Sequence, residues 1–387
     1  MTTATSAPTI ARFRRIPAET ILLVAVIVLV VTGVLIVFDT SFPLSLASKK
    51  VGNDPYYFGK VQTAGLIAGL LGMALAIRIG YSALLHFSKL FMVAGMVLLT
   101  LVWFPHVGVA KLHGRRWIHL GLVFQPSEIA KLTLILFLAA MLAEGTYGVK
   151  RVTSRVSPAL IVTAIYLMLI LMEPDLGTAI VLFLAFLTMY CVAGAKAKQI
   201  GAILLLVPIL VLLKGGLKPG QMSRLTVFMQ QGESAAGDGY QSYHSKLAIG
   251  SGEYTGVGWG SGREKYYLPQ ANSDYIFATV GEEFGLIGTS IMVLAFAVVT
   301  WSGVIIALQA PDKFGRLLAT GLTALISWQA LINIAVVTIS IPATGVPLPF
   351  ISNGLTSLIL TLVSVGVLVS IAQQSRGTRI GTVAQQV

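Results

Sequence analysis

The stretch ILLVAVIVLVVTGVLIVF, Ile21–Phe38, contains no charged residue, and Thr32 is its only polar side chain. An apolar run of about 18 residues or more is long enough to cross the hydrocarbon core of a bilayer as a helix. Comparable runs recur along most of the chain. The sequence therefore predicts an all-α fold, a polytopic integral membrane protein.

The composition agrees with this prediction. The 387 residues are 56% hydrophobic and 11% charged, with a mean hydropathy of +0.84, whereas soluble proteins carry about 25% charged residues. The net charge of +12 falls in short loops, which is typical of charges that set membrane topology and argues against a nucleic-acid partner. The single cysteine, Cys191, excludes an intrachain disulfide and a Cys-based metal site, and we interpret it as a lipid-facing or packing residue.

About ten apolar segments are predicted to cross the membrane. They are 21–38, 61–79, 83–104, 127–144, 157–172, 177–194, 198–214, 276–308, 317–338 and 354–374. The eighth is long enough to be tilted or broken. We assign 21–374 to one membrane domain with a large loop at about 215–275, and 1–20 and 375–387 to tails. An even number of spans places both tails on one side.

Positive residues predict the orientation, because lysine and arginine concentrate in cytoplasmic loops. Those on the side of the N-terminus are Arg12, Arg14, Arg15, Arg78, Lys89, Lys150, Arg151, Arg155, Lys196, Lys198, Lys313, Arg316, Arg376 and Arg379. Both termini are therefore predicted to be cytoplasmic, and the first span is a retained signal anchor. Outer loops are predicted at 39–60 and 105–125. The outer segment 215–275 mixes aromatics, glycines and charges, which predicts a structured functional element.

Charges at the edges of apolar spans are costly and are functional candidates. Glu128 and Lys131 lie three residues apart on one helix face, after Pro126, which favours a helix start. A packing ion pair and a substrate role are both open. In the turn 173–175, we expect Asp175 to cap the following helix.

Two outer groups point to anion and proton chemistry. The first group is Arg115, Arg116 and Trp117. Arginine binds phosphate oxygens, and tryptophan is enriched at the level of the lipid headgroups. We therefore predict that this group binds an anionic ligand, and we favour this over the alternative of a simple interfacial anchor. Asp274 ends the large loop at the mouth of the bundle, where partial burial raises a carboxylate's pKa toward that of a general base. A helix-capping aspartate would give the same pattern.

The glycine run GVGWGSG, 256–262, is not a dinucleotide loop, because it neither follows a strand nor opens a helix. We interpret it as a flexible stretch beside Arg263 and Lys265.

Six motifs occur in order along the chain: FQPSE (124–128), EPDLGTA (173–179), AIGSG (248–252), LPQANSDYIF (268–277), GEEFGLIG (281–288) and IPATGVPLPFIS (341–352). In this order they resemble the SEDS family, which includes RodA, FtsW and SpoVE. The resemblance spans nearly the whole membrane domain. It implies a peptidoglycan glycosyltransferase that polymerises lipid II at the outer face of the bacterial cytoplasmic membrane, with a class B penicillin-binding protein as partner.

The resemblance also implies site residues. The family's essential aspartate falls on Asp274, its Arg-Trp pair on Arg116 and Trp117, its QPSE glutamate on Glu128 with Lys131 following, and its loop arginine on Arg224. The chain departs from the family at Gln270, Asn272, Ser273 and in the run Ser352-Asn353-Gly354-Leu355. Segments 256–265 and 268–269 favour the FtsW and SpoVE branch, and segment 345–349 favours the RodA branch. We favour the FtsW and SpoVE branch, while division, elongation and sporulation stay open.

These residues define a hypothesis. Asp274 accepts the proton of the acceptor sugar's 4-hydroxyl, and the substrate-binding residues Arg115, Arg116, Trp117, Glu128, Lys131, Arg224 and Lys265 bind the lipid-linked pyrophosphate substrate. A divalent cation, Mg²⁺ or Mn²⁺, is a candidate cofactor without an assigned ligand set. The alternatives are a precursor transporter that uses the charges at 128, 131, 282 and 283, and a non-catalytic scaffold of the wall synthase.

Overall fold

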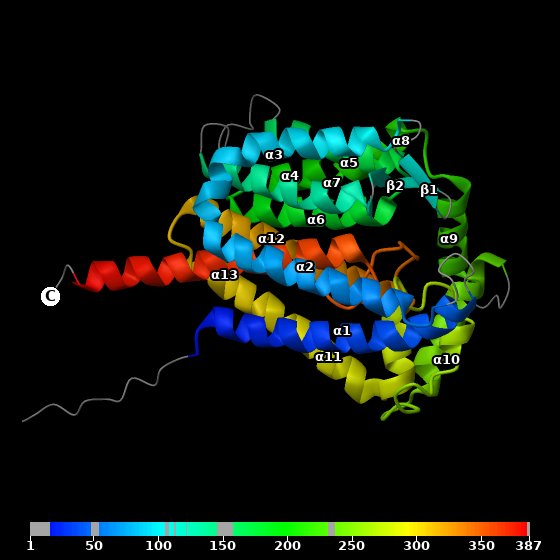
Figure 1. Ribbon diagram of the computed structural model, residues 1–387. Coiled ribbons are helices and arrows are strands. Elements are labelled where there is room, and N and C mark those ends of the chain that lie inside the picture. Colours follow the sequence, from blue (N-terminus) through cyan, green and yellow to red (C-terminus); the bar gives the residue numbers. More distant parts are fainter. Residues whose placement is uncertain are drawn as a thin grey trace, which may run out of the picture.

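The computed structural model describes residues 16–47, 54–104, 108–111, 114–120, 122–144, 158–230 and 237–384. These residues form a bundle of long helices lying side by side, with the short helices α9 (Pro219–Met229) and α10 (Tyr240–Ser251) and a small sheet gathered at one end (Figure 1). Several predicted topogenic charges lie outside the described residues: Arg12, Arg14, Arg15, Lys150, Arg151, Arg155 and the side chain of Arg379.

Seven helices in the described ranges are long and apolar enough to cross a membrane. They are α1 (Ala18–Ala47), α2 (Tyr57–Ile79), α3 (Tyr81–Leu101), α4 (Pro126–Ala143), α11 (Ile276–Gln309), α12 (Lys313–Val337) and α13 (Leu355–Ala384). Shorter apolar helices cover the other three predicted spans: α5 (Pro158–Met172), α6 (Leu176–Val192), and α7 (Ala197–Leu204) with α8 (Leu206–Leu213). The predicted polytopic α-helical fold is confirmed.

The seventh predicted span is divided at Leu205, between α7 and α8. Pro208 follows three residues later and has no N–H to donate to Leu204, so the helical hydrogen bonding is interrupted there.

The first described helix begins, and the last described helix ends, at the same end of the bundle (Figure 1). The start of α1 and the end of α13 lie opposite the sheet and the short helices (Figure 1), and Arg376 of α13 forms an ion pair with Glu19 of α1. The turns from α2 to α3 and from α11 to α12 lie at the same end. This arrangement matches the predicted even number of crossings.

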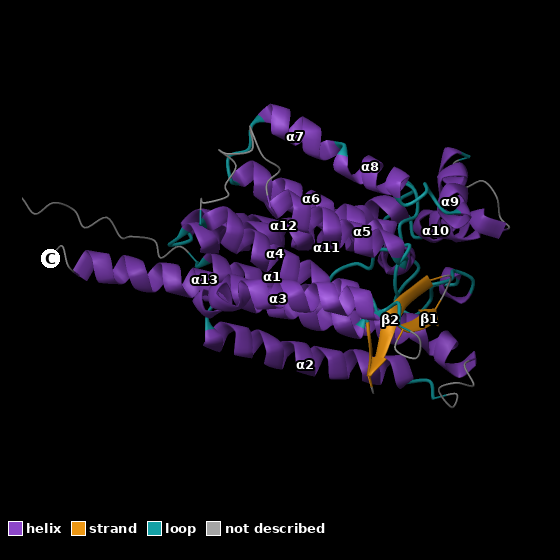
Figure 2. Ribbon diagram, turned by 90° about the horizontal axis from the view of Figure 1, so that it is seen from above, coloured by secondary structure: helices purple, strands orange, loops and turns teal. Residues whose placement is uncertain are grey.

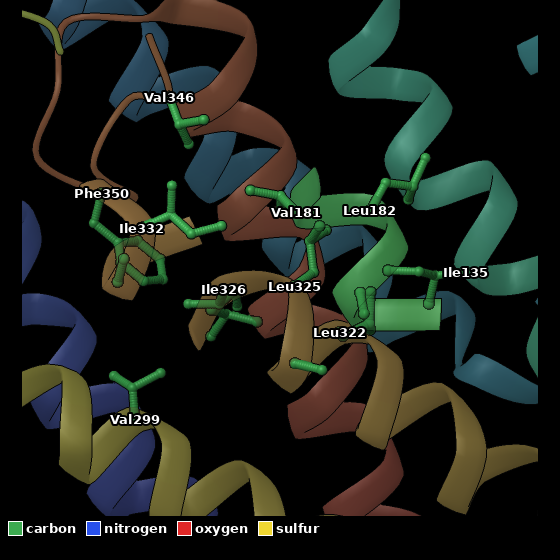
Figure 3. Close-up of a cluster of buried hydrophobic side chains, with 14 of the residues drawn as sticks. Ile135, Val181, Leu182, Val299, Leu322, Leu325, Ile326, Ile332, Val346 and Phe350 are labelled. Atoms are coloured by element: carbon green, nitrogen blue, oxygen red, sulfur yellow. The ribbon is translucent and has the colours of Figure 1, made fainter. Parts of the chain in front are cut away.

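Helices α4 and α12 lie at the centre of the bundle. Within the apolar window of α4, 78% of residues are buried, against 17% for α2 and α3, whose exposed apolar side chains can face lipid. Figure 3 shows side chains of α4, α6, α11 and α12 meeting in one cluster, joined by Val346 and Phe350 from the loop after α12. That loop, 341–352, is therefore anchored in the core.

The predicted outer loop at 105–125 contains a small sheet, which the all-α prediction did not include. Strands β1 (Gly108–Lys111), β2 (Gly114–Leu120) and β3 (Leu122–Phe124) form an antiparallel sheet in the order β1-β2-β3, at the end of the bundle beside the short helices (Figure 2). Side chains alternate across a strand. Arg116 therefore lies on the same face of β2 as Ile118, which is fully buried.

The large segment after α8 is structured where it is described, as predicted. It contains α9 (Pro219–Met229), the 3₁₀ turn η3 (Gly237–Gly239), α10 (Tyr240–Ser251) and the 3₁₀ turn η4 (Glu264–Tyr266). The prediction that the first outer loop starts at residue 39 is wrong, because α1 continues to Ala47 and Asp39 is part of that helix.

Helix α11 is broken at Gly285, where φ is 62° and ψ is −158°. An unbroken helix would pair the N–H groups of Leu286 and Ile287 with the carbonyls of Glu282 and Glu283. The large loop supplies partners to all four groups. Leu286 and Ile287 donate to the carbonyls of residues 253 and 254, at 2.9 and 3.1 Å; the carbonyls of residues 282 and 283 accept from the N–H groups of residues 257 and 258, at 2.9 and 3.1 Å.

Backbone groups within a bilayer must find hydrogen-bond partners in the protein, so the segment 253–258, which we call the plug, makes the break tolerable. The interpretation of the glycine run as a flexible stretch is wrong, because its first residues form the plug. A Cβ on Gly256, whose φ is 80°, would lie 2.1 Å from the carbonyl oxygen of Glu283. Only glycine fits there.

We expect Gly256→Ala to lower the thermal unfolding midpoint of the purified protein markedly. The added methyl separates the plug from α11 and adds strain at positive φ, together about 1–3 kcal/mol or more. Gly250→Ala in α10 is the matched control, since a Cβ there has nothing within 4 Å. Equal thermal midpoints for Gly256→Ala and Gly250→Ala would contradict the claim that contact between the plug and α11 stabilises the protein.

Candidate active site at the end of the bundle

Asp274 lies directly before α11, at the end that carries the sheet and short helices. The residue that caps α11 is Tyr275, without a side-chain hydrogen bond, so Asp274 does not act as a helix cap. Its side chain is half-buried and accepts a hydrogen bond of 3.0 Å from the Ser273 hydroxyl. Burial raises the pKa of Asp274; the Ser273 hydrogen bond, Arg224 and Arg116 oppose this, and Asp175 reinforces it.

The backbone around Asp274 is held from two sides. Asn333 of α12 donates through Nδ2 to the carbonyl of Asp274 at 2.8 Å and to the carbonyl of Val346 at 2.7 Å. Ser352 donates to the carbonyl of Ser273 at 2.7 Å. Helix α12 and the core-anchored loop 341–352 thus fix the carboxylate at the mouth of the bundle.

Arg224 reaches the same place from α9. Its Nη1 donates to the carbonyl of Ala343 at 3.4 Å. A Cβ built on Gly345 would lie 3.4 Å from Asp274 Oδ2 and 3.9 Å from Arg224 Nη1. Asp274 and Arg224 therefore flank one glycine of the loop 341–352.

Arg116 of β2 binds the turn between α5 and α6. Its Nε donates to the carbonyl of Glu173 at 3.1 Å, its Nη2 donates to the carbonyl of Pro174, and its Nη1 lies 3.8 Å from Asp175 Oδ2. A guanidinium has five N–H groups, so donors remain for a ligand. Asp175 caps α6 by accepting the N–H of Thr178 at 3.1 Å, as predicted.

Glu173 is fully buried, and neither carboxyl oxygen has a hydrogen-bond partner among the described residues. Burial, reinforced by Asp175 and opposed by Arg116, raises the pKa of Glu173 to about 9. Glu173 therefore keeps its proton near pH 7. The surroundings of Arg116 are less negative than they would be if Glu173 were ionised beside Asp175.

This protonation gives a test by pH. A carboxyl with a raised folded-state pKa holds its proton in the folded chain but loses it in the unfolded chain between pH 4.5 and about 9. Stability then falls as pH rises across that window, by up to about 1.4 kcal/mol per pH unit. We expect Glu173→Gln to remove this fall and to raise the thermal midpoint at pH 8. Glu253→Gln, at an exposed side chain, is the control, and its stability should vary with pH as that of the wild type does. If the stability of Glu173→Gln also varied with pH like the wild type, the assignment of Glu173 as a neutral acid would be contradicted.

Glu128 and Lys131 form a buried ion pair of 2.8 Å on α4. Lys131 Nζ also donates to Gln329 Oε1 at 2.8 Å, and Gln329 Nε2 donates to the carbonyl of Pro347 at 3.0 Å. The pair is thus connected through α12 to the loop that holds Asp274. These contacts favour the packing role of the two open interpretations.

The other predicted site residues are placed less directly. Trp117 lies on β2, paired in register with Val109, on the opposite face from Arg116. Arg115 lies on the same strand, but its side chain is outside the described part. Lys265 is bound to Asp39, Glu283 and the carbonyl of Gly260, so its ammonium donors are used within the protein, and we do not retain it as a substrate-binding residue.

One residue that holds Asp274 escaped the sequence argument. Asn333 follows Gln329 by one helical turn inside an apolar span, and two polar side chains at that spacing in a membrane helix are the signal that could have identified it.

The family model of the cell cycle proteins FtsW, RodA and SpoVE matches residues 19–377. The chain belongs to this family. Stage V sporulation protein E of Bacillus subtilis is 35% identical over 363 residues, covering 92% of this chain and 98% of that protein. The probable peptidoglycan glycosyltransferase FtsW of Geobacter metallireducens is also 35% identical, covering 93% and 96%.

Solved structures share the fold of this FtsW/RodA/SpoVE family member. RodA of Thermus thermophilus superimposes with a TM-score of 0.66 at 26% identity, over 91% of this chain and 96% of that one. A chain of a peptidoglycan synthase complex that coordinates polymerization and crosslinking gives a TM-score of 0.73 at 26% identity, over 92% and 97%.

Proposed function

We propose that this chain is a peptidoglycan glycosyltransferase, which polymerises lipid II into glycan strands at the outer face of the bacterial cytoplasmic membrane. The observation that carries the proposal is the half-buried carboxylate of Asp274, fixed at one end of a membrane bundle with Arg224 and Arg116 near it. The names of the FtsW relatives support the activity.

The geometry suits an inverting transfer. The ionised Asp274 accepts the proton of the acceptor sugar's 4-hydroxyl while that oxygen attacks the anomeric carbon of the lipid-linked glycan from the face opposite the pyrophosphate. The bond between the anomeric carbon and the pyrophosphate breaks, and the pyrophosphate leaves with the electron pair. Arg224 and the remaining N–H donors of Arg116 stabilise its negative charge.

The orientation follows from charge. Arg78, Lys196, Lys198, Lys313, Arg316 and Arg376 lie in or beside the turns opposite Asp274. Because such residues are enriched on the cytoplasmic side, we place both termini in the cytoplasm and the site outside. The exposed apolar side chains of α2 and α3 provide surfaces for membrane lipid and for the polyprenyl tails of the substrate.

A class B penicillin-binding protein is the proposed partner, supported by the likeness to a chain of a peptidoglycan synthase complex. A divalent cation is a second proposed component. In the described part of the chain, no three His, Cys, Asp or Glu side chains form a metal site. A Mg²⁺ or Mn²⁺ ion would therefore rest mainly on pyrophosphate oxygens, and no step above depends on it.

The decisive experiment is reconstitution. The purified chain, with and without its class B partner, is placed in proteoliposomes and given labelled lipid II, and glycan products are separated on gels. Polymer formed by the chain supports the proposal. Movement of lipid II across the bilayer without polymer would favour a transporter, and polymer only after addition of another polymerase would favour a scaffold. Growth phenotypes on depletion then separate division, elongation and sporulation.

A further inference from the structure

Glu282 and Glu283 end the outer segment of α11, just before the break at Gly285, and the proposed reaction uses neither. Glu282 Oε1 accepts the backbone N–H groups of Arg263 and Glu264 at 2.6 and 3.1 Å. Glu283 Oε1 accepts a hydrogen bond of 2.9 Å from Lys265 Nζ. Both carboxylates therefore bind the large loop, beside the plug.

Lys265 is the centre of this contact. Its Nζ lies 2.7 and 2.6 Å from the two carboxylate oxygens of Asp39 on α1 and 3.0 Å from the carbonyl of Gly260. Its side chain is 2% exposed and that of Glu283 is fully buried. One buried cation thus joins the large loop, α1 and α11.

The position of this ion pair relative to Asp274 is the informative feature. Lys265 precedes Asp274 by nine residues and Glu283 follows it by nine, so their ion pair closes the segment 265–283 into a ring with Asp274 at its midpoint. The four hydrogen bonds between the plug and α11 hold the helix at residues 282–287, where this ring closes. We infer that Lys265 is a positioning residue, which holds the Asp274 carboxylate in place by closing this segment against Glu283 and Asp39.

The inference rests on the proposed function, in which Asp274 is the base. Without the lysine cation, the partly buried carboxylate of Asp39 would face the fully buried carboxylate of Glu283, and their repulsion would open the ring. A general base must stay within hydrogen-bonding reach of the proton that it takes, and a displacement of about 1 Å can cost about 10²-fold in rate.

The first measurement is hydrogen–deuterium exchange of the full chain, which is independent of activity. Lysine 265 is replaced by methionine or by arginine, and Lys60→Met serves as the control because Lys60 pairs with Asp54 at an exposed site. We expect about tenfold faster exchange in peptides covering 266–284 for Lys265→Met, and near wild-type exchange for Lys265→Arg and Lys60→Met. Unchanged exchange in Lys265→Met overturns the inference.

The second measurement is lipid II polymerisation at varied pH. The groups facing Asp274 are Ser273, Tyr275, Asp175, Arg224 and Arg116, and a displaced Asp274 meets them differently. We expect Lys265→Met to lower kcat by about 10- to 10²-fold with KM little changed, and to shift the acid limb of the pH–rate profile. If Lys265→Met only reduced the folded fraction of the protein, the rate would fall by the same factor at every pH and the acid limb would not shift.

The two proposals fail differently. If Asp274→Ala still polymerises, the proposed base is wrong, and the exchange data alone decide whether Lys265 positions the segment. If Asp274→Ala is inactive while Lys265→Met keeps wild-type kcat and pH profile, the positioning role is wrong.

Discussion

We expect Asp274→Ala to lower the rate of glycan polymerisation by about 10²–10⁴-fold, the usual contribution of a general base. Alanine keeps the backbone hydrogen bond from Asn333 to the carbonyl of residue 274, so the thermal midpoint should change little. The rate is measured with labelled lipid II and the class B partner. Asp54→Ala, which removes a surface carboxylate that pairs with Lys60, should polymerise at the wild-type rate. Polymerisation at the wild-type rate by Asp274→Ala would contradict the assignment of Asp274 as the general base.

The pH dependence has a definite sign. The base acts when ionised, and burial raises the pKa of Asp274 above its ordinary value of 3.8. The rate should therefore fall as pH is lowered through the raised pKa, at a higher pH than an exposed aspartate would give. Asp274→Asn should lose this acid limb and show the same large loss of rate across the whole pH range.

Lys131→Met should be strongly destabilising, at about 3–5 kcal/mol, because it leaves Glu128 buried without its cation. Glu128 and Lys131 have side chains only 5% and 4% exposed. The double variant Glu128→Leu with Lys131→Met should recover most of the loss, since apolar residues replace the whole pair. Some loss remains because Gln329 Oε1 no longer receives the Lys131 hydrogen bond.

The measurement is thermal or denaturant unfolding of the purified variants. Lys60→Met is the control, because an exposed ion pair contributes about 0–1 kcal/mol. A double variant as unstable as Lys131→Met would show that the uncompensated charge is not the cause.

Features that rest on local patterns were predictable from the sequence. Each apolar run became helical, although the seventh is divided at Leu205 and the eighth is broken at Gly285, because span length is decided within the run itself. The Glu128–Lys131 pair and the Asp175 cap depend on spacings of three residues, and both are present.

Features that depend on distant partners were not predictable. Asp39 binds Lys265 across 226 positions of sequence, and no local signal joins them. The sheet was missed because β2 has only seven residues, too few for its alternation to stand out in a loop. The approach of Arg224 to Asp274 was suggested by the family resemblance rather than by any spacing.

The break in α11 has a consequence for biosynthesis. Residues 253–258 leave the ribosome before α11 does, so the partners for the interrupted helix are already made when the helix enters the bilayer. The backbone groups at the break near Gly285 therefore do not have to remain in lipid without hydrogen-bond partners, which is a state of high free energy. A circularly permuted chain that synthesised the plug after α11 would have to insert this helix without its partners, and we expect membrane integration at that step to suffer first.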